Sequence, residues 1–259
     1  MTILDKITTY KQQEVSAKKE AFPIEQLENS LLFQRKPVSL AEAIRSAPTG
    51  IIAEHKRRSP SKSVINDQIG LPEVIKGYES AGVSGISVLT DTRFFGGSLE
   101  DLLLARQLVS IPLLRKDFII DAYQIYEAKA YGADAILLIA ACLSHEELVD
   151  FSAKAKQLGL DVLLEVHSLD ELKRSMIETV DLIGVNNRNL KTFEVSLETS
   201  KVLADHIPEQ FVKISESGIS DVVAIRELKN YGYKGFLIGE NFMKTNNPGE
   251  SALNFIKSI

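Results

Sequence analysis

Charged side chains stand at the ends of several short apolar runs in the sequence. Glu54 and Lys56 close one run, Lys116 ends a second, Glu165 lies near the end of a third, and Glu216 directly follows a fourth. Side chains two positions apart on a strand share a face, so Glu54 and Lys56 point the same way. Lysine and glutamate groups that shift each other's pKa suit acid–base chemistry. Because burying uncompensated ions is costly, stability does not explain such a set, and we predict that it is catalytic.

A second set of residues suits the binding of an anion. Arg188 lies just beyond a further apolar run, next to Asn186 and Asn187, and glycines follow two more runs as Gly218 and Gly239. Glycine lets backbone N–H groups approach an anion closely, and barrels of parallel strands often hold phosphate after their last two strands. Together with Ser59, these residues predict a phosphate site.

The segment after the first run is long and basic. It reads KRRSPSKSVINDQIG and contains Lys56, Arg57, Arg58 and Lys62 beside a Ser-Pro-Ser turn. Such a segment can close over an anionic substrate. For Arg57 and Arg58 we expect a solvated position instead.

Apolar side chains are expected at the same rim. They are Phe94, Phe95, Phe118, Leu137 and Leu190. Phe118 lies two positions beyond Lys116 on the same face, and it is the strongest candidate for the wall of an apolar pocket.

The apolar runs recur along the chain with helical segments between them. Their first residues fall 20 to 35 positions apart, which is the length of a strand, a helix and two short loops. The eight runs are GIIAE (50–54), GISVL (85–89), PLLRK (112–116), AILLI (135–139), DVLLEV (161–166), DLIGV (181–185), FVKIS (211–215) and GFLIG (235–239). The charged set follows the first, third, fifth and seventh runs, and alternate strands of a closed barrel contribute to one interior layer.

Eight such units predict an α/β fold, a (β/α)8 TIM barrel. The 259 residues fit one barrel domain over residues 1–259, whereas a doubly wound sheet would carry a glycine-rich phosphate loop that this sequence lacks. Serines that cap helices precede several of the helical segments, with an acidic residue three positions later, at Ser98, Ser144 and Ser168.

The first 48 residues lie outside this repeat. Ile3, Leu4, Ile7 and Tyr10 follow helical spacing, and Ser39 is placed to cap a short helix, LAEAIRS. Residues 1–48 are therefore expected to form a helical N-terminal extension that closes the barrel bottom or overhangs its mouth.

Several classes of function are disfavoured. The net charge of −5 is spread along the chain without a basic patch, and there is neither a long apolar run nor a signal-peptide pattern, so we expect no nucleic acid or membrane partner. A single cysteine, Cys142, fits a reducing compartment, so a cytoplasmic location is expected. The four histidines lack metal-ligand spacing, so no metal is expected, and His55 is interpreted as a hydrogen-bonded structural residue.

Beyond these patterns, the sequence resembles the indole-3-glycerol phosphate synthase family. AEHKRRSPSK resembles the family's first-strand motif, in which an acid, a lysine and a Ser-Pro-Ser turn follow the strand. Six further segments resemble the family's motifs for strands 3 to 8, in order: LLRKDFIID, ADAILLIA, LLEVH, IGVNNRNL, ISESGI and FLIGENFM. The likeness extends from about Ser39 to Met243 and includes a helical N-terminal extension of the family's type.

The resemblance implies a ring-closing carboxy-lyase of tryptophan biosynthesis. Its substrate would be 1-(2-carboxyphenylamino)-1-deoxyribulose 5-phosphate, a sugar phosphate with an anthranilate ring, and no cofactor is implied. By the same resemblance Lys116 would be the general acid, and Lys56 would pair with the carboxylate that is lost. Glu165 would transfer the proton of dehydration, while Glu54 and Asn186 would orient groups. A lysine serves as such an acid if its neighbours bring its pKa towards neutrality.

The resemblance also implies the binding residues. Glu216 and Ser217 would hold substrate hydroxyls or the lysine network. The phosphate ligands would be Ser59, Arg188, Gly218 and Gly239, and the aromatic pocket would be lined by Pro60, Phe118, Leu137 and Leu190.

Three positions depart from the family pattern: His55, Ser63 and Glu240. Glu240 stands among the substrate-binding candidates where the phosphate loop usually has serine. A carboxylate facing phosphate would repel it, so we expect the Glu240 side chain to turn away, towards Lys244.

Two alternatives remain. One is another phosphate-binding barrel of the same pathway, such as phosphoribosylanthranilate isomerase, which uses a cysteine and an aspartate, or the tryptophan synthase α subunit. The other is a catalytically inactive barrel that serves as a binding protein.

Overall fold

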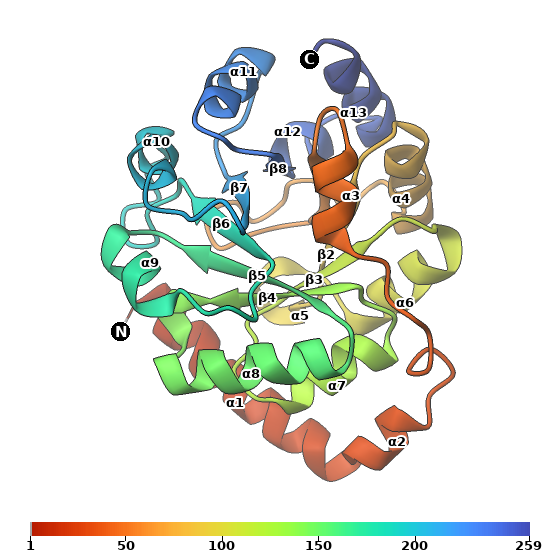
Figure 1. The fold of residues 1–259 in the computed structure, drawn as a ribbon. Helices are drawn as coiled ribbons and strands as arrows, with labels where there is room; N and C mark the ends of the chain where they lie inside the picture. The colour runs from red at the N-terminus through yellow and green to blue at the C-terminus, as the bar shows by residue number, and fades with distance from the viewer. Residues whose placement is uncertain (1) are drawn as a thin grey trace.

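Eight parallel strands close into a barrel in the computed structural model, which describes residues 2–259 (Figure 1). Each strand pairs with the next, and β1 pairs with β8. The strands are β1 (Ile51–His55), β2 (Gly85–Leu89), β3 (Leu113–Lys116), β4 (Ala135–Ile139), β5 (Asp161–Val166), β6 (Leu182–Asn186), β7 (Val212–Glu216) and β8 (Gly235–Ile238). The predicted TIM barrel is confirmed, with strand ends that differ from the predicted runs by at most one residue.

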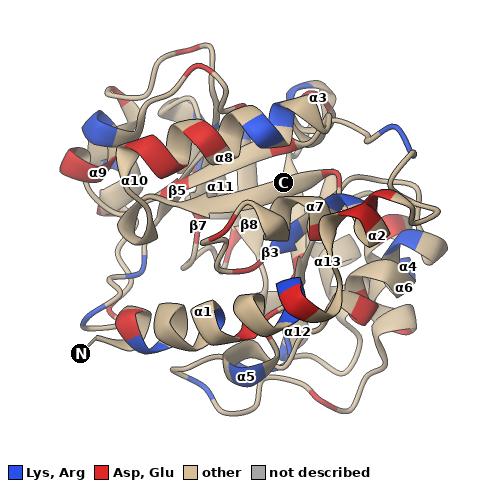
Figure 2. Ribbon diagram, turned by 90° about the horizontal axis from the view of Figure 1, so that it is seen from below, with Lys and Arg blue, Asp and Glu red and all other residues tan. Residues whose placement is uncertain are grey.

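Helices connect the strands and surround the barrel (Figure 1). They are α4 (Leu71–Ser80), α5 (Thr92–Phe95), α6 (Leu99–Leu108), α7 (Tyr123–Ala130), α8 (His145–Gln157), α9 (Leu169–Ser175), α10 (Glu198–Ala204), α11 (Val222–Asn230), α12 (Glu240–Met243) and α13 (Pro248–Lys257), with a 3-10 turn, η1 (Ala140–Cys142). Outer helices such as α8 and α9 carry both acidic and basic side chains (Figure 2).

The predicted serine caps are present. Ser98, Ser144 and Ser168 each accept a hydrogen bond from the backbone N–H three residues ahead. Only Ser144 is in a reciprocal capping box, in which Glu147 accepts from the Ser144 N–H. The acidic side chains after the other two serines bind elsewhere: Asp101 pairs with Arg57, and Glu171 binds His167.

One N-terminal helix closes the barrel at the strand N-termini. In α3 (Leu40–Ser46), Leu40 and Ile44 are buried with interior side chains such as Ile52 and Ile214. Leu40 lies beside Gly85 and Ile44 beside Gly235, the first residues of β2 and β8, where a side chain on either glycine would collide. The contact between α3 and the barrel is stabilised by the burial of apolar surface.

The first helix lies at the opposite end. α1 (Ile3–Ala21) lies beside α5 (Figure 2). The Tyr10 and Phe94 rings meet edge-on, with centroids 6.1 Å apart. It is followed by α2 (Ile24–Glu28), which packs on α7. The extension therefore does both things expected of it, because α3 closes the bottom while α1 reaches the mouth.

A buried lysine fastens α1 to the barrel. Lys11 is fully buried, and its Nζ lies 3.1 Å from Asp91 Oδ2 and 3.0 Å from Asp117 Oδ1. Asp91 caps α5, and Asp117 directly follows the end of β3. Burial alone would lower the pKa of Lys11, but Asp117, Asp91 and Glu14 outweigh it and raise that pKa, so the ammonium stays charged.

No helix within residues 2–259 has both the length and the hydrophobicity needed to span a membrane.

We expect Lys11→Met to destabilise the fold. Removing one partner of a buried ion cluster leaves Asp91 without its cation and Asp117 with Arg115 alone, which costs about 3–5 kcal/mol of unfolding free energy. Urea denaturation would measure the loss. The control is Lys19→Met on the same helix, whose exposed pair with Asp121 contributes less than about 1 kcal/mol. Equal losses in both variants would contradict a role of burial.

Candidate active site

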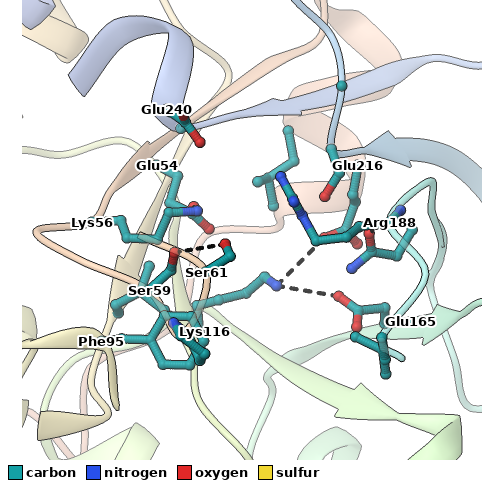
Figure 3. Close-up of a pocket in the computed structure, with 18 of the residues that line it drawn as sticks. Glu54, Lys56, Ser59, Ser61, Phe95, Lys116, Glu165, Arg188, Glu216 and Glu240 are labelled. Atoms are coloured by element: carbon teal, nitrogen blue, oxygen red, sulfur yellow. Dashed lines mark hydrogen bonds and ion pairs between the residues drawn. The ribbon is translucent and has the colours of Figure 1, made fainter. Parts of the chain in front are cut away.

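A cavity of about 340 Å³ opens at the C-terminal ends of the strands. Its walls contain sixteen of the residues expected from the sequence, several of which are labelled in Figure 3. These are Glu54, Lys56, Ser59, Pro60, Lys116, Phe118, Leu137, Glu165, Asn186, Arg188, Leu190, Glu216, Ser217, Gly218, Gly239 and Glu240. Asn187 is not among them, because its side chain is buried against Ser200 and Ser215. The volume suits a small organic molecule.

The centre of the cavity is an ion cluster around Lys116 (Figure 3). Lys116 Nζ lies 3.2 Å from Glu165 Oε2 and 3.5 Å from Glu216 Oε2. Lys56 Nζ lies 2.5 Å from Glu54 Oε1. These groups come from β1, β3, β5 and β7, the alternate strands that share a layer in a barrel of this kind.

The carboxylates keep Lys116 positively charged. Burial by itself would lower its pKa, but Glu165, Glu216 and Glu54 outweigh burial and raise it. The condition stated above for a lysine acid, that its neighbours bring its pKa towards neutrality, is therefore not met by this arrangement of charges. Lys116 carries its proton at neutral pH.

Glu216 is the carboxyl group that the cluster leaves least satisfied. Burial raises its pKa, and Glu165 and Glu54 raise it further against the effect of Lys116, so the pKa reaches about 8. Its Oε1 has no hydrogen-bond partner among the described residues. Burial by itself would also raise the pKa values of Glu54 and Glu165, but nearby cations outweigh it and lower both. For Glu54 these cations are Lys56 and Lys116, and for Glu165 they are Lys116 and His167.

Glycines make room for two of these carboxylates. A Cβ on Gly184 would overlap Glu216 Oε1, and a Cβ on Gly239 would lie 2.5 Å from Glu54 Oε1. Real Cβ contacts are not that short, so a larger residue at either position would displace an acid of the cluster.

Cationic and polar groups line the rim of the cavity. Arg188 donates its backbone N–H to Asn186 Oδ1 at 3.0 Å and its Nη1 to the carbonyl of Phe193 at 3.2 Å. Ser59 is hydrogen-bonded to Ser61 at 3.2 Å (Figure 3). Ser217 and Gly218 adopt positive φ angles of 67° and 78°, which aims the chain after β7 at this rim.

Glu240 is paired with a different lysine from the one expected. Its Oε1 accepts a hydrogen bond from Lys62 Nζ at 3.0 Å, whereas Lys244 contacts only its backbone carbonyl. The Lys62 hydrogen bond, together with Lys56 and Arg188, lowers the pKa of Glu240. The expectation of Lys244 is wrong because the first loop folds back onto α12, a contact between segments far apart in the sequence.

Two arginines of the first loop are hydrogen-bonded to the segment after β2, Arg57 in a partly buried position and Arg58 at the surface. Arg57 binds Asp101 through both Nη atoms and donates to the carbonyl of Gly96. Arg58 donates to the carbonyls of Thr92 and Arg93. The expectation of a solvated position is wrong for Arg57, which is partly buried, and is met by Arg58, which is exposed although its guanidinium is hydrogen-bonded. The partners of both residues follow β2, so the sequence around the arginines does not indicate them.

The apolar side of the cavity combines predicted and unpredicted residues. Phe118 packs with Phe95, ring centroids 5.9 Å apart, beside Leu137 and Leu190, while Phe94 faces α1 instead. The cavity is also lined by side chains that were not expected there, three of them from α1: Ile3, Leu4, Ile7, Ser61, Leu89, Asp117, Ile139, Phe193, Ile219, Ser220, Leu237, Ile238, Asn241 and Lys244. The helical spacing of Ile3 and Ile7 was a signal, but it did not indicate which surface they meet.

Other groups take no part in this cluster. His55 is buried, its pKa falls to about 4 mainly through burial, and its Nε2 lacks a hydrogen-bond partner, contrary to the expectation of a hydrogen-bonded histidine. Burial raises the pKa of the Cys142 thiol to about 12, so it is not a thiolate nucleophile. Within residues 2–259, no group of His, Cys, Asp and Glu side chains is arranged to hold a metal ion.

Barrel and site together define a (β/α)8-barrel enzyme with an acid–base cluster at its catalytic end. The family model of indole-3-glycerol phosphate synthase matches residues 4–255. The chain belongs to this family of carboxy-lyases.

Relatives at high identity carry the same name. An indole-3-glycerol phosphate synthase of Bacteroides thetaiotaomicron is 49% identical over 99% of this chain and 98% of that protein. One of Caldanaerobacter subterraneus subsp. tengcongensis is 45% identical over 93% of each.

Solved structures at low identity share the fold alone. Thiamine phosphate pyrophosphorylase from Pyrococcus furiosus superimposes with a TM-score of 0.60 at 15% identity, over 85% of this chain and 96% of that one. KGPDC from Streptococcus mutans superimposes with a TM-score of 0.61 at 13% identity, over 80% and 95% of the two chains.

We expect Glu216→Gln to change how stability depends on pH. The folded-state pKa of Glu216 is about 8 against an ordinary 4.5, so its proton stabilises the fold below pH 4.5. That contribution is lost as the pH rises through 8. The unfolding free energy of the unmodified protein should therefore fall relative to that of the variant between pH 5 and 9, about the range of this titration.

Urea denaturation at several pH values would measure the difference. Glu20→Gln, at an exposed carboxyl group of α1, is the control and should run parallel to the unmodified protein. A Glu216→Gln curve that also runs parallel would mean that Glu216 is ionised in the fold at neutral pH.

Proposed function

We propose that this chain closes the indole ring of 1-(2-carboxyphenylamino)-1-deoxyribulose 5-phosphate, with loss of carbon dioxide and water, to give indole-3-glycerol phosphate. The observation that carries the proposal is the buried ammonium of Lys116, which lies between an apolar wall and a cationic rim. The substrate has matching parts, because an aromatic ring and a phosphate flank its reacting ketone.

Substrate binding uses the two sides of the cavity. The phosphate is bound by Arg188 and Ser59, and by the backbone after β7 and β8 at Gly218 and Gly239. The anthranilate ring lies against Pro60, Phe118, Leu137 and Leu190, and its carboxylate pairs with Lys56. Fixing both ends restricts the flexible sugar chain, which supplies much of the proximity term of catalysis.

Ring closure needs a proton at the ketone oxygen. The aromatic carbon that carries the carboxylate attacks the ketone carbon, and Lys116 donates its proton to the oxygen, which becomes a hydroxyl group. Carbon dioxide then leaves, and the electron pair of the broken C–C bond stays in the ring. The ion pair with Lys56 fixes the position of the Glu54 side chain. Glu216 and Ser217 lie beside Lys116 and the sugar hydroxyls.

Dehydration completes the pyrrole ring. The hydroxyl leaves as water with a proton from Lys56, or from Lys116 once Lys116 has regained a proton from solvent, and Glu165 takes the ring proton that must be lost. Asn186 stands beside Glu165 and lowers its pKa by a hydrogen bond, which favours the carboxylate form needed in a base.

The alternative functions find less support. An isomerase with a cysteine acid–base group does not fit, because the pKa of Cys142 is raised by burial. An inactive binding barrel does not need an ion cluster that is costly to bury. The cytoplasmic location, the absence of nucleic acid partners and the single-domain organisation stay predictions.

We expect Lys116→Met to lower kcat by about 100-fold or more, the contribution of a positioned acid. The substitution also leaves Glu165 and Glu216 without this cation, so the free energy of unfolding should fall, and kcat is compared on protein whose fold is verified by circular dichroism. Indole-3-glycerol phosphate formation can be followed by its ultraviolet absorbance. Lys76→Met, at an exposed lysine of α4, is the control. Near-normal turnover in Lys116→Met would rule out Lys116 as the acid.

Arg188→Ala is expected to raise KM for the substrate by about tenfold or more, since a charge-assisted hydrogen bond contributes about 1.5–3 kcal/mol. Inhibition by an analogue without phosphate should change little. Lys191→Ala, an exposed cation of the same loop, is the control. If both ligands weakened equally, Arg188 would not be a phosphate ligand.

A further inference from the structure

A histidine outside the proposed set of catalytic residues faces the carboxylate of Glu165. His167 follows the last residue of β5, and only 11% of its side chain is exposed. Its Nε2 lies 3.4 Å from Glu165 Oε1, on the side of that carboxylate away from Lys116. Nε2 is buried and makes no hydrogen bond within the described residues. The acidic group that faces it is Glu165.

The other ring nitrogen is fixed by a second carboxylate. His167 Nδ1 lies 3.2 Å from Glu171 Oε2, and the backbone N–H of His167 donates to the same oxygen at 2.8 Å. His167 and Arg174 help to lower the pKa of Glu171 against the effect of burial, so Glu171 is ionised and can only accept. Nδ1 must therefore carry a hydrogen atom.

This tautomer leaves one proton for Nε2 and Glu165 to share. If Nε2 is protonated, it donates to the Glu165 carboxylate. If Nε2 is bare, its lone pair faces Glu165 without repulsion only when Glu165 is itself protonated. The distance of 3.4 Å is long for a hydrogen bond and lies within the range of an ion pair.

We propose that His167 is a positioning residue of the active site, held by Glu171 so that its protonated Nε2 donates to Glu165 and orients that carboxylate. This inference rests on the proposed role of Glu165 as the base of dehydration. The proton stays on Nε2, so Glu165 remains an ionised carboxylate that can take the proton of the substrate ring.

The surroundings favour a cationic imidazole. Burial would lower the pKa of His167, but Glu171, Glu165 and Glu216 outweigh it and raise the pKa above the ordinary value. Cys142 lies near the same acids, and its thiol is neutral. The groups that face this histidine are thus mainly acidic, and a neutral replacement removes one of the two cations, with Lys116, that lower the pKa of Glu165.

Two substitutions separate the contacts of His167. Glutamine can place its amide nitrogen where Nε2 lies and donate to Glu165, but it does not titrate. Asparagine is shorter and reaches only the position of Nδ1, beside Glu171. Both should shift the acidic limb of the kcat/KM profile to higher pH by about one unit, the lower end of what a neighbouring cation does to a carboxylate. His167→Asn should also lose about tenfold in kcat at little change in KM, and His167→Gln should retain more.

The control is His145→Gln, an exposed histidine whose Nδ1 contacts the carbonyl of Arg174. It should leave the pH profile unchanged. Unmodified protein without indole-3-glycerol phosphate formation would refute the proposed function itself. Active unmodified protein with unshifted pH profiles in both His167 variants would overturn this inference alone. An equal loss of kcat in both variants, accompanied by equal losses of melting temperature, would also overturn it, since the role would then be structural.

Discussion

The ammonium group of Lys116 can stay buried at the barrel rim only because carboxylates from neighbouring strands surround it. Glu165 and Glu216 approach it directly, and Glu54 acts from β1, where Lys56 shares its charge. Two lysines do not fully compensate three acids in a buried layer, so Glu216 keeps its proton up to a pKa of about 8. The closed barrel keeps these lysines and carboxylates together, since its alternate strands contribute side chains to one interior layer.

The N-terminal helices α3 and α1 pack against opposite ends of that barrel, and different interactions stabilise the two contacts. α3 is held at the bottom by apolar burial, with Leu40 and Ile44 inside the interior cluster. α1 is held at the mouth by the buried ions of Lys11, one of whose partners, Asp117, is the neighbour of Lys116 in sequence. The helix that supplies Ile3 and Ile7 to the pocket is thus anchored beside the strand that supplies the proposed acid.

The rim combines cations with a single exposed acid. Lys62 pairs with Glu240, and the Asn66 side chain donates to the carbonyls of Met243 and Thr245, so the first loop is fastened to the chain after β8. Glu240 lies at the cavity edge but is neutralised by Lys62. A carboxylate in this position is compatible with an anionic ligand because a lysine accompanies it.

The sequence by itself determined the repeat, and with it the barrel, because strand and helix periodicities and serine caps are local properties. It also determined the charged layer, since Glu54, Lys116, Glu165 and Glu216 occupy equivalent ends of alternate strands. Only the tertiary structure decided the partners of long side chains, such as Lys62 with Glu240, Arg57 with Asp101 and Lys11 with Asp117. It also decided which face α1 covers and that the pKa of Lys116 rises. Those outcomes depend on distances between segments far apart in the chain, which no local pattern encodes.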